Sequence, residues 1–473
     1  MNTQEFYSLI TQQFPFTPTP KQEVLLRQLS NFIIEGTTNE VYVLKGYAGT
    51  GKTTIISTLV SNLWKIKKSA VLMAPTGRAA KVISNYSNKE AFTIHKKIYF
   101  PKKNKSGAIS FVLQPNKHKD TLFIVDEASM IPDIPGESKL FENGSLLDDL
   151  MQYVYSGHRC KLLLIGDTAQ LPPVKLELSP ALDVDKLSLN YSKNVTQIEL
   201  DQVVRQTQDS GILSNATQLR LQIKQEQTHS FRFTLDSFQD IVRLTDGEEI
   251  MSAIHDAYSS LGNEETAIIV RSNKRANLYN QSIRERILFN ENELTAGDYL
   301  MVVKNNYFWI KPTSEAGFIA NGDIVQVLEI FKIESLYGFR FAHVKIKMVD
   351  YPKMKPFETV LLLDTIMAES PSLSYEESNK LYQEVLKDYE NETSKYRKFL
   401  KVKNNKYFNA LQVKFSYAIT CHKSQGGQWN TVFIEQPYLP NGIDVEYLRW
   451  LYTAVTRATS KLYLIGFKDD FFV

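Results

Sequence analysis

Eight consecutive residues have the types and spacing of a phosphate-binding loop. They read G-Y-A-G-T-G-K-T, from Gly46 to Thr53, and match G-x-x-x-x-G-K-[ST] at every fixed position. The backbone N–H groups of such a loop wrap a β-phosphate, and the following helix adds a favourable dipole. Lys52 would reach the β- and γ-phosphates, and the Thr53 hydroxyl would hold Mg²⁺. The residues expected to bind the nucleotide here are Gly46, Tyr47, Ala48, Gly49, Thr50, Gly51, Lys52, Thr53 and Thr54.

Two further polar segments follow apolar runs. Asp126 and Glu127 end the run F-I-V, where an edge of a parallel sheet would meet the phosphates. Asp126 would hold Mg²⁺ through water, and Glu127 would orient and deprotonate an attacking water. The segment G-D-T-A-Q-L-P-P-V, from Gly166 to Val174, follows the next apolar run. Its Gln170 would sense a γ-phosphate.

Parallel strands must bring these segments together. The first half of the chain alternates apolar strand patterns with helical patterns, which predicts an α/β fold with a parallel sheet covered on both faces. The strands of this sheet are expected at 41–46, 70–75, 121–127 and 160–167. A second α/β sheet is expected from strands at 196–200, 266–272, 415–420, 431–435 and 461–467.

The sequence pattern departs from α/β alternation between about residues 297 and 408. Residues 299–363 alternate like β-strands with turn signals, which predicts a small antiparallel barrel. Residues 374–392 predict a helix that begins with a capping box of Ser374 and Glu377. Its apolar stripe consists of Leu381, Val385 and Tyr389. Because the remaining surface of this helix is polar, we expect it to project from the body.

Composition excludes several classes of protein. The 473 residues are 43% hydrophobic and 23% charged, unlike a disordered, collagen-like or coiled-coil chain. The only cysteines, Cys160 and Cys421, lie far apart, which excludes a disulfide scaffold and a C-x-x-C zinc site and suits a reducing compartment. The N-terminus lacks the pattern of a signal peptide, and no apolar run approaches the length of a membrane span. These features predict an intracellular, cytoplasmic protein without membrane contact.

The charges are balanced overall but clustered locally. The chain has 55 basic and 52 acidic residues, a net charge of +3. Residues 96–119 carry seven lysines and no acidic residue, and residues 395–406 carry six basic residues and no acidic residue. Aromatic residues are interleaved with both. One such stretch alone fits a solvated loop, but two in a balanced chain favour a footprint for nucleic-acid phosphates.

Taken together, these motifs resemble those of superfamily 1 DNA helicases, in particular the RecD/Dda-like branch. The resemblance extends from about residue 17 to 467. The further segments that carry it are F-T-P-T-P-K-Q at 16–22, A-P-T-G-R-A-A at 74–80, T-I-H at 93–95, V-V-R-Q at 203–206, T-C-H-K-S-Q-G-G-Q-W at 420–429 and L-Y-T-A-V-T-R-A at 451–458. The resemblance implies an ATP-dependent DNA helicase that translocates 5′→3′ along single-stranded DNA, in DNA repair or recombination and close to the nucleoid.

The resemblance also implies roles for individual residues. Gln22 would read adenine, and Gln428, where many superfamily 1 enzymes have Glu, would contact the ribose without a charge. Arg205 would contact the γ-phosphate, and Arg457 would be the arginine finger. The expected catalytic set is Lys52, Glu127, Gln170, Arg205 and Arg457. The expected DNA contacts are Thr76, His95, His422, Lys423 and Ser424, with Tyr99 and Phe100 stacking on the last base pair.

The expected domains follow the same resemblance. The first RecA-like domain would span 1–190, with a strand-separating pin at about 96–119. The second would combine 191–298 and 409–473, and an SH3-like barrel with a helical tower would occupy 299–408. The two sheet domains would clamp one ATP, with arginines of the second stabilising the transferring phosphoryl group. The protein is expected to act as a monomer on single-stranded DNA and on single–double-strand junctions.

Three alternatives stay open at this point. A P-loop phosphotransferase would need an acceptor site and would leave the second sheet and Arg457 unexplained. A binding module with a relic of the loop would be expected to have lost Lys52, Glu127 or Arg457, and all three are present. An RNA substrate, or a single-strand-stimulated ATPase that does not unwind, is compatible with loops that contact only the backbone.

Overall fold

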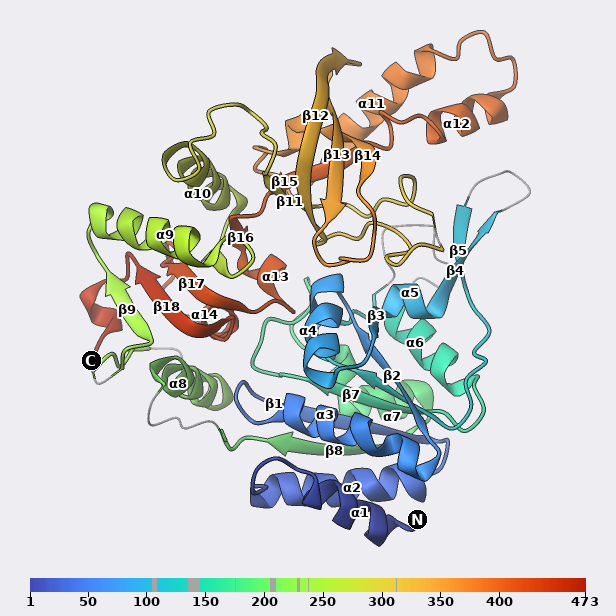
Figure 1. Ribbon diagram of the computed structural model, residues 1–473, viewed down its shortest axis with the longest axis vertical. Coiled ribbons are helices and arrows are strands. Elements are labelled where there is room, and N and C mark those ends of the chain that lie inside the picture. Colours follow the sequence, from blue (N-terminus) through green and yellow to red (C-terminus); the bar gives the residue numbers. More distant parts are fainter. Residues whose placement is uncertain are drawn as a thin grey trace.

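The computed structural model describes residues 1–103, 109–134, 145–174, 176–204, 210–227, 230–236, 238–311 and 313–473. The main parts of the structure are two α/β units, each a parallel sheet with its helices and called a layer below, and a β-barrel (Figure 1). In Figure 1 the first layer lies at the bottom, the second on the left and the barrel at the top. Among the described residues, no helix is long and apolar enough to cross a lipid bilayer.

The first sheet has six parallel strands in the order β3-β2-β6-β7-β1-β8. Its strands are β1 (Glu40–Gly46), β2 (Ser69–Ala74), β3 (Ala91–Thr93), β6 (Thr121–Val125), β7 (Lys161–Gly166) and β8 (Asn194–Leu200). Its helices are α1 (Thr3–Gln12), α2 (Pro20–Ile34), α3 (Lys52–Asn62), α4 (Gly77–Ser87), α5 (Ile94–Ile98), α6 (Leu146–Tyr155) and α7 (Val184–Tyr191). The expected parallel sheet is confirmed.

Alternate residues of β1 show why both faces of this sheet are covered. Tyr42 and Leu44 pack in one apolar cluster with α1, α2 and α3, whereas Val41 and Val43 pack in another with α5 and α6. Successive side chains of a strand point to opposite faces of the sheet. A strand that is covered by helices on both faces is therefore apolar throughout. The carboxyl ends of β1, β6 and β7 therefore meet at one edge, where the three polar segments begin.

Strand β8 corrects the expected assignment. The segment 196–200 was expected in the second sheet, but β8 pairs in parallel with β1, from Glu40–Asn194 to Gly46–Leu200. That prediction is wrong, because a strand pattern does not encode its pairing partner. The first sheet thus continues past residue 190 to Leu200.

The second sheet has five parallel strands in the order β16-β10-β17-β18-β9. Its strands are β9 (Ile241–Leu244), β10 (Thr266–Val270), β16 (Ala418–Thr420), β17 (Trp429–Glu435) and β18 (Ala458–Ile465). Its helices are α8 (Gly211–Gln225), α9 (Gly247–Leu261), α10 (Asn273–Arg286), α13 (Cys421–Ser424) and α14 (Val445–Val455). The strands expected at 266–272, 431–435 and 461–467 are confirmed, while β9 had not been expected.

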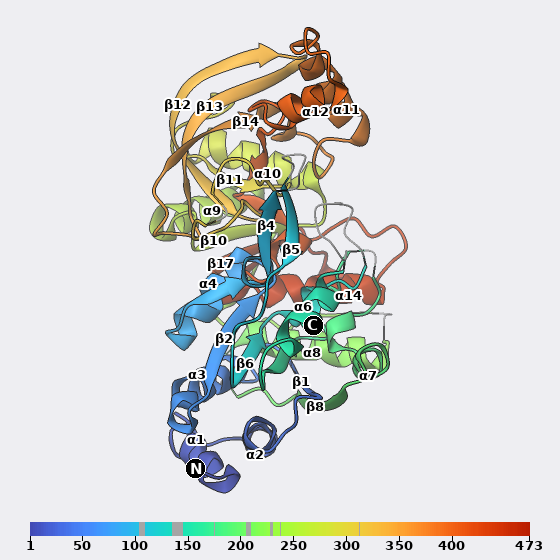
Figure 2. The same ribbon diagram turned by 90° about the vertical axis from the view of Figure 1, so that its right-hand side faces the viewer.

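A two-stranded hairpin rises from the first layer toward the barrel (Figure 2). It consists of β4 (Tyr99–Lys103) and β5 (Ile109–Leu113), paired antiparallel directly after α5. The chain therefore forms a hairpin at the position expected for the pin.

The barrel is closed by five strands. They are β11 (Tyr299–Val302), β12 (Ile324–Leu336), β13 (Phe339–Met348), β14 (Phe357–Leu362) and β15 (Leu411–Phe415). The expected barrel is confirmed, but not its bounds or its purely antiparallel pairing. Strand β15, which continues into the segment expected in the second sheet, pairs antiparallel with β11 and parallel with β14. Closure thus depends on a strand that lies about fifty residues beyond the expected end.

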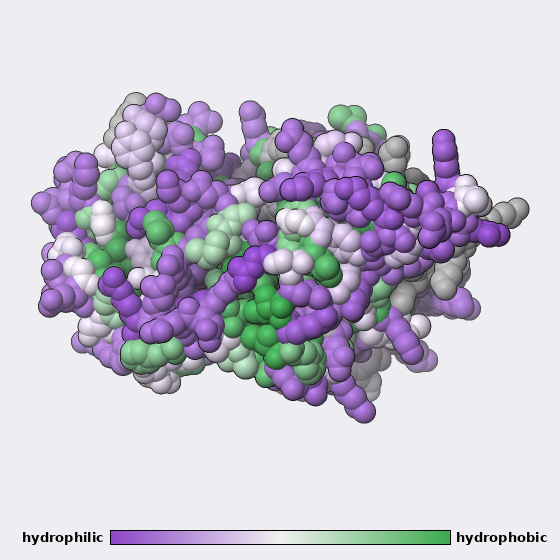
Figure 3. Space-filling model, turned by 90° about the horizontal axis from the view of Figure 1, so that it is seen from above, coloured by the Kyte–Doolittle hydropathy of each residue, from purple (hydrophilic) through white to green (hydrophobic). Residues whose placement is uncertain are grey.

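Two helices project beside the barrel at the upper right of Figure 1. The first, α11 (Tyr375–Lys387), begins with the expected capping box of Ser374 and Glu377. The second, α12 (Lys395–Lys403), comes from the basic stretch. Leu381, Val385 and Val402 anchor the pair on the barrel. Seen from above, this part of the molecule is mainly hydrophilic (Figure 3), as a helix with one narrow apolar stripe requires.

Candidate functional site

The phosphate-binding loop connects β1 to α3. Gly49 and Gly51 have φ of 75° and 84°, a backbone region that favours glycine. A Cβ at Gly46 would lie 2.9 Å from Cδ of Lys52, so this glycine makes room for the lysine stem. Lys52 Nζ donates to the carbonyls of Gly46 at 2.6 Å and Tyr47 at 2.8 Å. The loop, its lysine and the helix N-terminus fit a nucleotide phosphate chain.

The remaining residues of the loop differ in how exposed their side chains are. Thr50 is buried, and its hydroxyl donates to the carbonyl of Tyr47 at 2.9 Å. Thr53 is exposed and Thr54 half-buried in the first turn of α3. The N–H of Ala48 donates to the hydroxyl of Tyr452, on the second layer, at 3.1 Å.

Gln22 lies against this loop. Its Nε2 donates to the carbonyl of Thr50 at 3.0 Å, and its Oε1 accepts the N–H of Thr19 at 3.0 Å. A Cβ at Gly51 would approach Gln22 Nε2 to 2.6 Å, which shows how closely the amide packs there. The structure brings Gln22 to the expected place, with both ends of its amide engaged by the protein. Because the amide has two N–H groups and two acceptor sites on its oxygen, each end keeps one further hydrogen bond to offer a ligand.

The acidic pair lies at the carboxyl end of β6. Asp126 Oδ1 accepts the N–H of Glu127 at 2.9 Å, and its Oδ2 accepts the hydroxyl of Tyr86 at 2.7 Å. Glu127 has a φ of 53°, an uncommon conformation for a residue with a side chain and one that clusters at functional sites. Tyr86, on α4, fixes the metal-binding candidate Asp126. No local sequence signal pointed to it.

Glu127 connects the two layers electrostatically. Burial raises the pKa of Glu127 above its usual range, and the positive charge of Arg457 opposes that rise more than any other group. Asp126 adds to the rise and Lys52 opposes it, in that order. These effects require the charged groups to lie close together. The lysine and the acidic pair of the first layer therefore lie within electrostatic reach of Arg457 of the second layer.

Arg457 follows α14 and is only 2% exposed. Its guanidinium donates to the carbonyls of Thr453 at 3.0 Å and Gly427 at 3.1 Å. These bonds fix the side chain by carbonyl groups of the second layer. Gln428, the expected ribose contact, directly follows Gly427 in the chain and is exposed. Arg205, the other expected arginine, lies outside the described residues.

Gln170 follows β7, the strand that pairs in parallel with β6 of the acidic pair. Its side chain is 5% exposed, and its Oε1 has no hydrogen-bond partner among the described residues. A buried acceptor of this kind costs free energy unless a ligand or water satisfies it. The Oε1 of Gln170 is therefore available to accept a hydrogen bond from a water molecule.

The expected DNA contacts fall into two groups. His422 is exposed on α13, and Thr76 is half-buried where its hydroxyl caps α4 by accepting the N–H of Ala79 at 3.2 Å. Lys423 donates to Oδ1 of Asn321 on the barrel, and burial lowers its pKa to about 8. Ser424, by contrast, is fully buried and donates to the carbonyl of Cys421 at 2.8 Å. Contrary to expectation, Ser424 does not lie at the surface.

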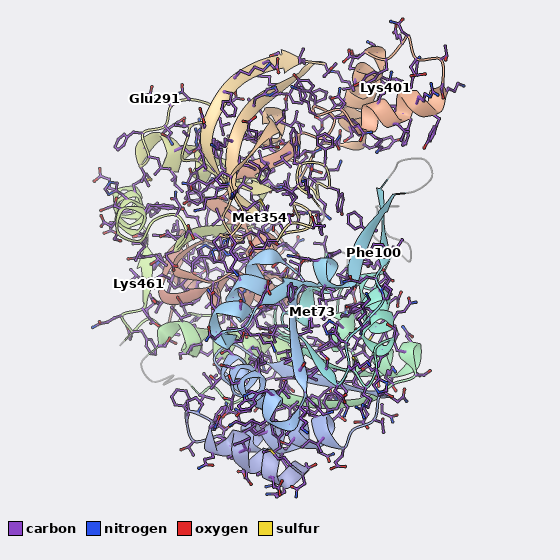
Figure 4. All side chains as sticks on the ribbon, turned by 45° about the vertical axis from the view of Figure 1, so that its right-hand side comes forward. Met73, Phe100, Glu291, Met354, Lys401 and Lys461 are labelled. Carbon is purple, nitrogen blue, oxygen red and sulfur yellow. The ribbon has the colours of Figure 1, made fainter. Side chains whose placement is uncertain are left out.

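The aromatic residues of the hairpin also separate. Phe100 is 40% exposed and lies on β4 at the side of the hairpin (Figure 4). Tyr99 is buried, and its hydroxyl donates to Asp149 on α6. The expectation that both rings stack on DNA does not fit this position of Tyr99. His95 packs in the same region, with ring centroids 5.8 Å from Tyr99 and 6.0 Å from Phe318, and burial lowers its pKa to about 4.

A groove separates the hairpin from the barrel. Phe100, Lys96 and Gln114 line it from the hairpin side, and Lys353, Met354 and Lys355 line it from the barrel side. Phe100 and Met354 are both labelled in Figure 4. Acidic residues Glu90 and Glu315 also border the groove. Its lysines and exposed aromatic ring suit a nucleic-acid strand.

A second contact between the layers had not been expected. The guanidinium of Arg78, at the start of α4, lies 4.0 Å from the ring centroid of Trp429. A Cβ at Gly426 would lie 2.9 Å from the Cβ of Ala79, so the glycine allows the two layers to touch. The Gly426–Gly427 pair was the available sequence signal for this close approach.

Comparisons with known proteins agree with this geometry. Residues 30–176 match the family model of an AAA domain, and residues 415–465 match that of a UvrD-like helicase C-terminal domain. The ATP-dependent DNA helicase dda of Enterobacteria phage T4 is 27% identical over 60% of this chain and 62% of its own length. The ATP-dependent RecD2 DNA helicase of Deinococcus radiodurans is 31% identical over 38% of this chain and 21% of its own length.

One solved structure is similar to this chain over nearly its whole length. The Pif1 helicase from Bacteroides, in complex with ADP-AlF3 and ssDNA, is 14% identical, with 97% of this chain and 95% of that chain covered and a TM-score of 0.46. The first family model matches part of the first layer and the second matches part of the second layer. Together with the two sequence relatives, they make this chain similar to superfamily 1 helicases, in particular to the Dda and RecD2 DNA helicases.

Proposed function

We propose that this protein is an ATP-dependent DNA helicase that moves 5′→3′ along single-stranded DNA and separates the duplex ahead of it. One observation supports this more than any other: the two layers touch at the phosphate-binding loop, where the N–H of Ala48 donates to the hydroxyl of Tyr452, and the charges of Lys52 and Arg457 both act on Glu127. A nucleotide bound there contacts both layers, so its hydrolysis changes how they fit together. Cleavage of ATP is thereby converted into relative motion.

The roles in hydrolysis follow from the chemistry of each group. Lys52 holds the β- and γ-phosphates, Glu127 takes a proton from the attacking water, and Arg457 stabilises the charge of the transferring phosphoryl group. Gln170 senses the γ-phosphate. Asp126 and Thr53 would hold Mg²⁺, which screens phosphate charge when bound. In the same proposal Gln22 reads adenine, Gln428 contacts the ribose and Arg205 reaches the γ-phosphate.

Single-stranded DNA would follow a track across both layers. Thr76, His422 and Lys423 would contact phosphates, and the groove beside Phe100 would guide the strand to the hairpin. The basic helix α12 lies above the hairpin in Figures 1 and 2. Such contacts read the backbone and not the base sequence. The polymer, DNA and not RNA, is proposed from the two sequence relatives.

A P-loop phosphotransferase is the second candidate, and the structure offers it less support. In that case Arg457 would have no reason to be buried against the cleft from a separate sheet. ATP hydrolysis measured with and without single-stranded DNA separates the two. The helicase proposal predicts strong stimulation by DNA, whereas a phosphotransferase would respond to a small acceptor and not to DNA.

Affinity for single-stranded DNA is expected to fall steeply with salt. Each neutralised phosphate contributes about 0.7 to the log–log slope, so about four contacts give a slope near −3. Replacing Lys395 and Lys398 of α12 by Gln should make the slope shallower by about 1.4. Lys461→Gln, far from the hairpin in Figure 4, is the matched control and should leave the slope unchanged. A wild-type slope near zero contradicts the proposed basic track.

Phe100→Ala is expected to slow duplex unwinding severalfold while DNA-stimulated ATP hydrolysis stays nearly intact. An aromatic ring stacked on the base pair at the fork stabilises the opened state by about 1–3 kcal/mol. Phe100 has no part in the nucleotide site. Both rates should be measured on one preparation.

Tyr99→Phe is the control for that experiment, because it removes the bond to Asp149 and keeps the buried ring. It should leave the ratio of the two rates unchanged. If Phe100→Ala lowers both rates together, Phe100 belongs to the translocation track. If it lowers neither, the strands separate elsewhere and the hairpin assignment is wrong.

A further inference from the structure

The hydroxyl of Tyr452 lies between the two loops that would handle the phosphates. Tyr452, on α14 of the second layer, is 1% exposed. Its oxygen accepts the N–H of Ala48 at 3.1 Å and donates to Oδ2 of Asp167 at 2.6 Å. Ala48 belongs to the phosphate-binding loop, and Asp167 follows β7. One second-layer hydroxyl therefore joins two first-layer loops.

The carboxylate of Asp167 also stabilises the loop that follows β7. Its side chain is 2% exposed, and its second oxygen, Oδ1, accepts the N–H of Ala169 at 2.9 Å. Burial, followed by the neighbouring Asp167 charge, holds the pKa of Tyr452 well above its usual range. The hydroxyl thus keeps its proton and donates a hydrogen bond to the carboxylate of Asp167. Because both oxygens of Asp167 are engaged, the geometry of residues 167–169 is set by Tyr452 and Ala169 together.

Other second-layer side chains hold the rest of this loop. Arg449 donates to the carbonyls of Thr168 and, at 3.3 Å, Gln170. Thr453 accepts the N–H of Leu171 at 2.9 Å. The phosphate-sensing candidate Gln170 is therefore positioned largely from α14.

The same loop is also held from the proposed DNA side. Gln425, which directly follows α13, donates from Nε2 to the carbonyl of Leu171 at 2.7 Å. His422 and Lys423, the proposed DNA contacts, lie within α13. A shift of α13 on DNA therefore acts directly on the loop that carries Gln170.

We infer that Tyr452 is a positioning residue that couples DNA binding to ATP hydrolysis, by holding the Ala48 N–H and the Asp167 carboxylate in register with α14. Arg457 follows the same helix, one turn and a residue beyond Tyr452, so the register of α14 also sets where its guanidinium lies. The inference rests on the proposed function. It assigns to Tyr452 an effect on turnover with DNA bound, not on nucleotide affinity.

Tyr452→Phe removes the hydroxyl and keeps the buried ring. We expect kcat for ATP with saturating single-stranded DNA to fall about tenfold, equivalent to about 1.4 kcal/mol. The KM for ATP should change less than about twofold, since the lost interaction acts on turnover. The ratio of ATPase rates with and without DNA should fall as well. A merely structural residue would lower the melting temperature without this split.

Tyr447→Phe is the matched control. Tyr447 is buried on the same helix, and its hydroxyl donates to Gln436 within the second layer at 2.7 Å. The same chemical change there should leave kcat and the DNA stimulation at wild-type values. Wild-type kinetics for Tyr452→Phe, or an equal loss in Tyr447→Phe, would overturn the inference.

A double-mutant cycle with Asp167→Asn tests the proposed route. If Tyr452 acts through Asp167, the double variant loses no more kcat than the more severe single variant. Losses that multiply would show independent effects and contradict the inference. The wild-type protein in the same assay tests the proposed function separately, because absence of DNA stimulation there refutes the helicase assignment whatever the variants do.

Discussion

Replacing Lys52 by Ala is expected to lower the rate of ATP hydrolysis at least about a hundredfold, the scale of one lost transition-state contact. In the structure Lys52 Nζ is held at the mouth of the loop by the carbonyls of Gly46 and Tyr47. Its positive charge thus lies at the loop that would hold the β- and γ-phosphates. Steady-state turnover with saturating single-stranded DNA measures the effect.

DNA binding without nucleotide should persist in this variant, because Lys52 lies outside the proposed DNA track. Lys65→Ala, in the turn Leu63–Ile66 that follows α3, is a suitable control and should hydrolyse ATP at the wild-type rate. Near-normal turnover of Lys52→Ala would refute the phosphate-binding role of the loop.

Glu127→Gln is expected to nearly abolish hydrolysis while ATP still binds. The amide keeps the shape of the side chain but cannot take a proton from water. Burial raises the pKa of Glu127, which makes the carboxylate a stronger base, and the positive charge of Arg457 opposes that rise. Binding of a fluorescent ATP analogue, measured beside turnover, separates the two effects.

Asp126→Asn offers the contrast. Asp126 is the proposed metal-binding carboxylate, so its replacement should raise the Mg²⁺ concentration needed for turnover, whereas Glu127→Gln should not. If Glu127→Gln loses ATP binding instead of hydrolysis, Glu127 has a structural or metal-binding role and the proposed base is wrong.

The nucleotide site was largely predictable because its motifs are local. The loop from Gly46 to Thr53 needs a strand before it and a helix after it, and both patterns stand next to it in the sequence. Asp126 and Gln170 likewise follow continuous apolar strands. In a parallel sheet the ends of such strands meet at one edge, so short-range patterns were enough to assemble the site.

Long-range pairing and burial were not predictable in the same way. Strand β8 looks like any other strand, and only its partner β1 places it in the first sheet. Tyr99 and Ser424 are polar residues in segments that resemble DNA-binding motifs, yet tertiary packing buries both. The role of the Tyr452 hydroxyl depends on groups about 285 and 404 residues away. A single sequence contains no local signal for such contacts.

Unwinding of short duplexes with a single-stranded overhang tests the central claim most directly. A labelled duplex with a 5′ overhang, one with a 3′ overhang and a blunt duplex are each mixed with the wild-type protein, Mg²⁺ and ATP, and release of the labelled strand is followed. The proposed function predicts ATP-dependent release from the 5′-overhang duplex, little from the other two, and none with Lys52→Ala. Release from the 3′-overhang duplex alone would contradict the direction, and no release from any substrate, despite ATP hydrolysis, would contradict the helicase assignment itself.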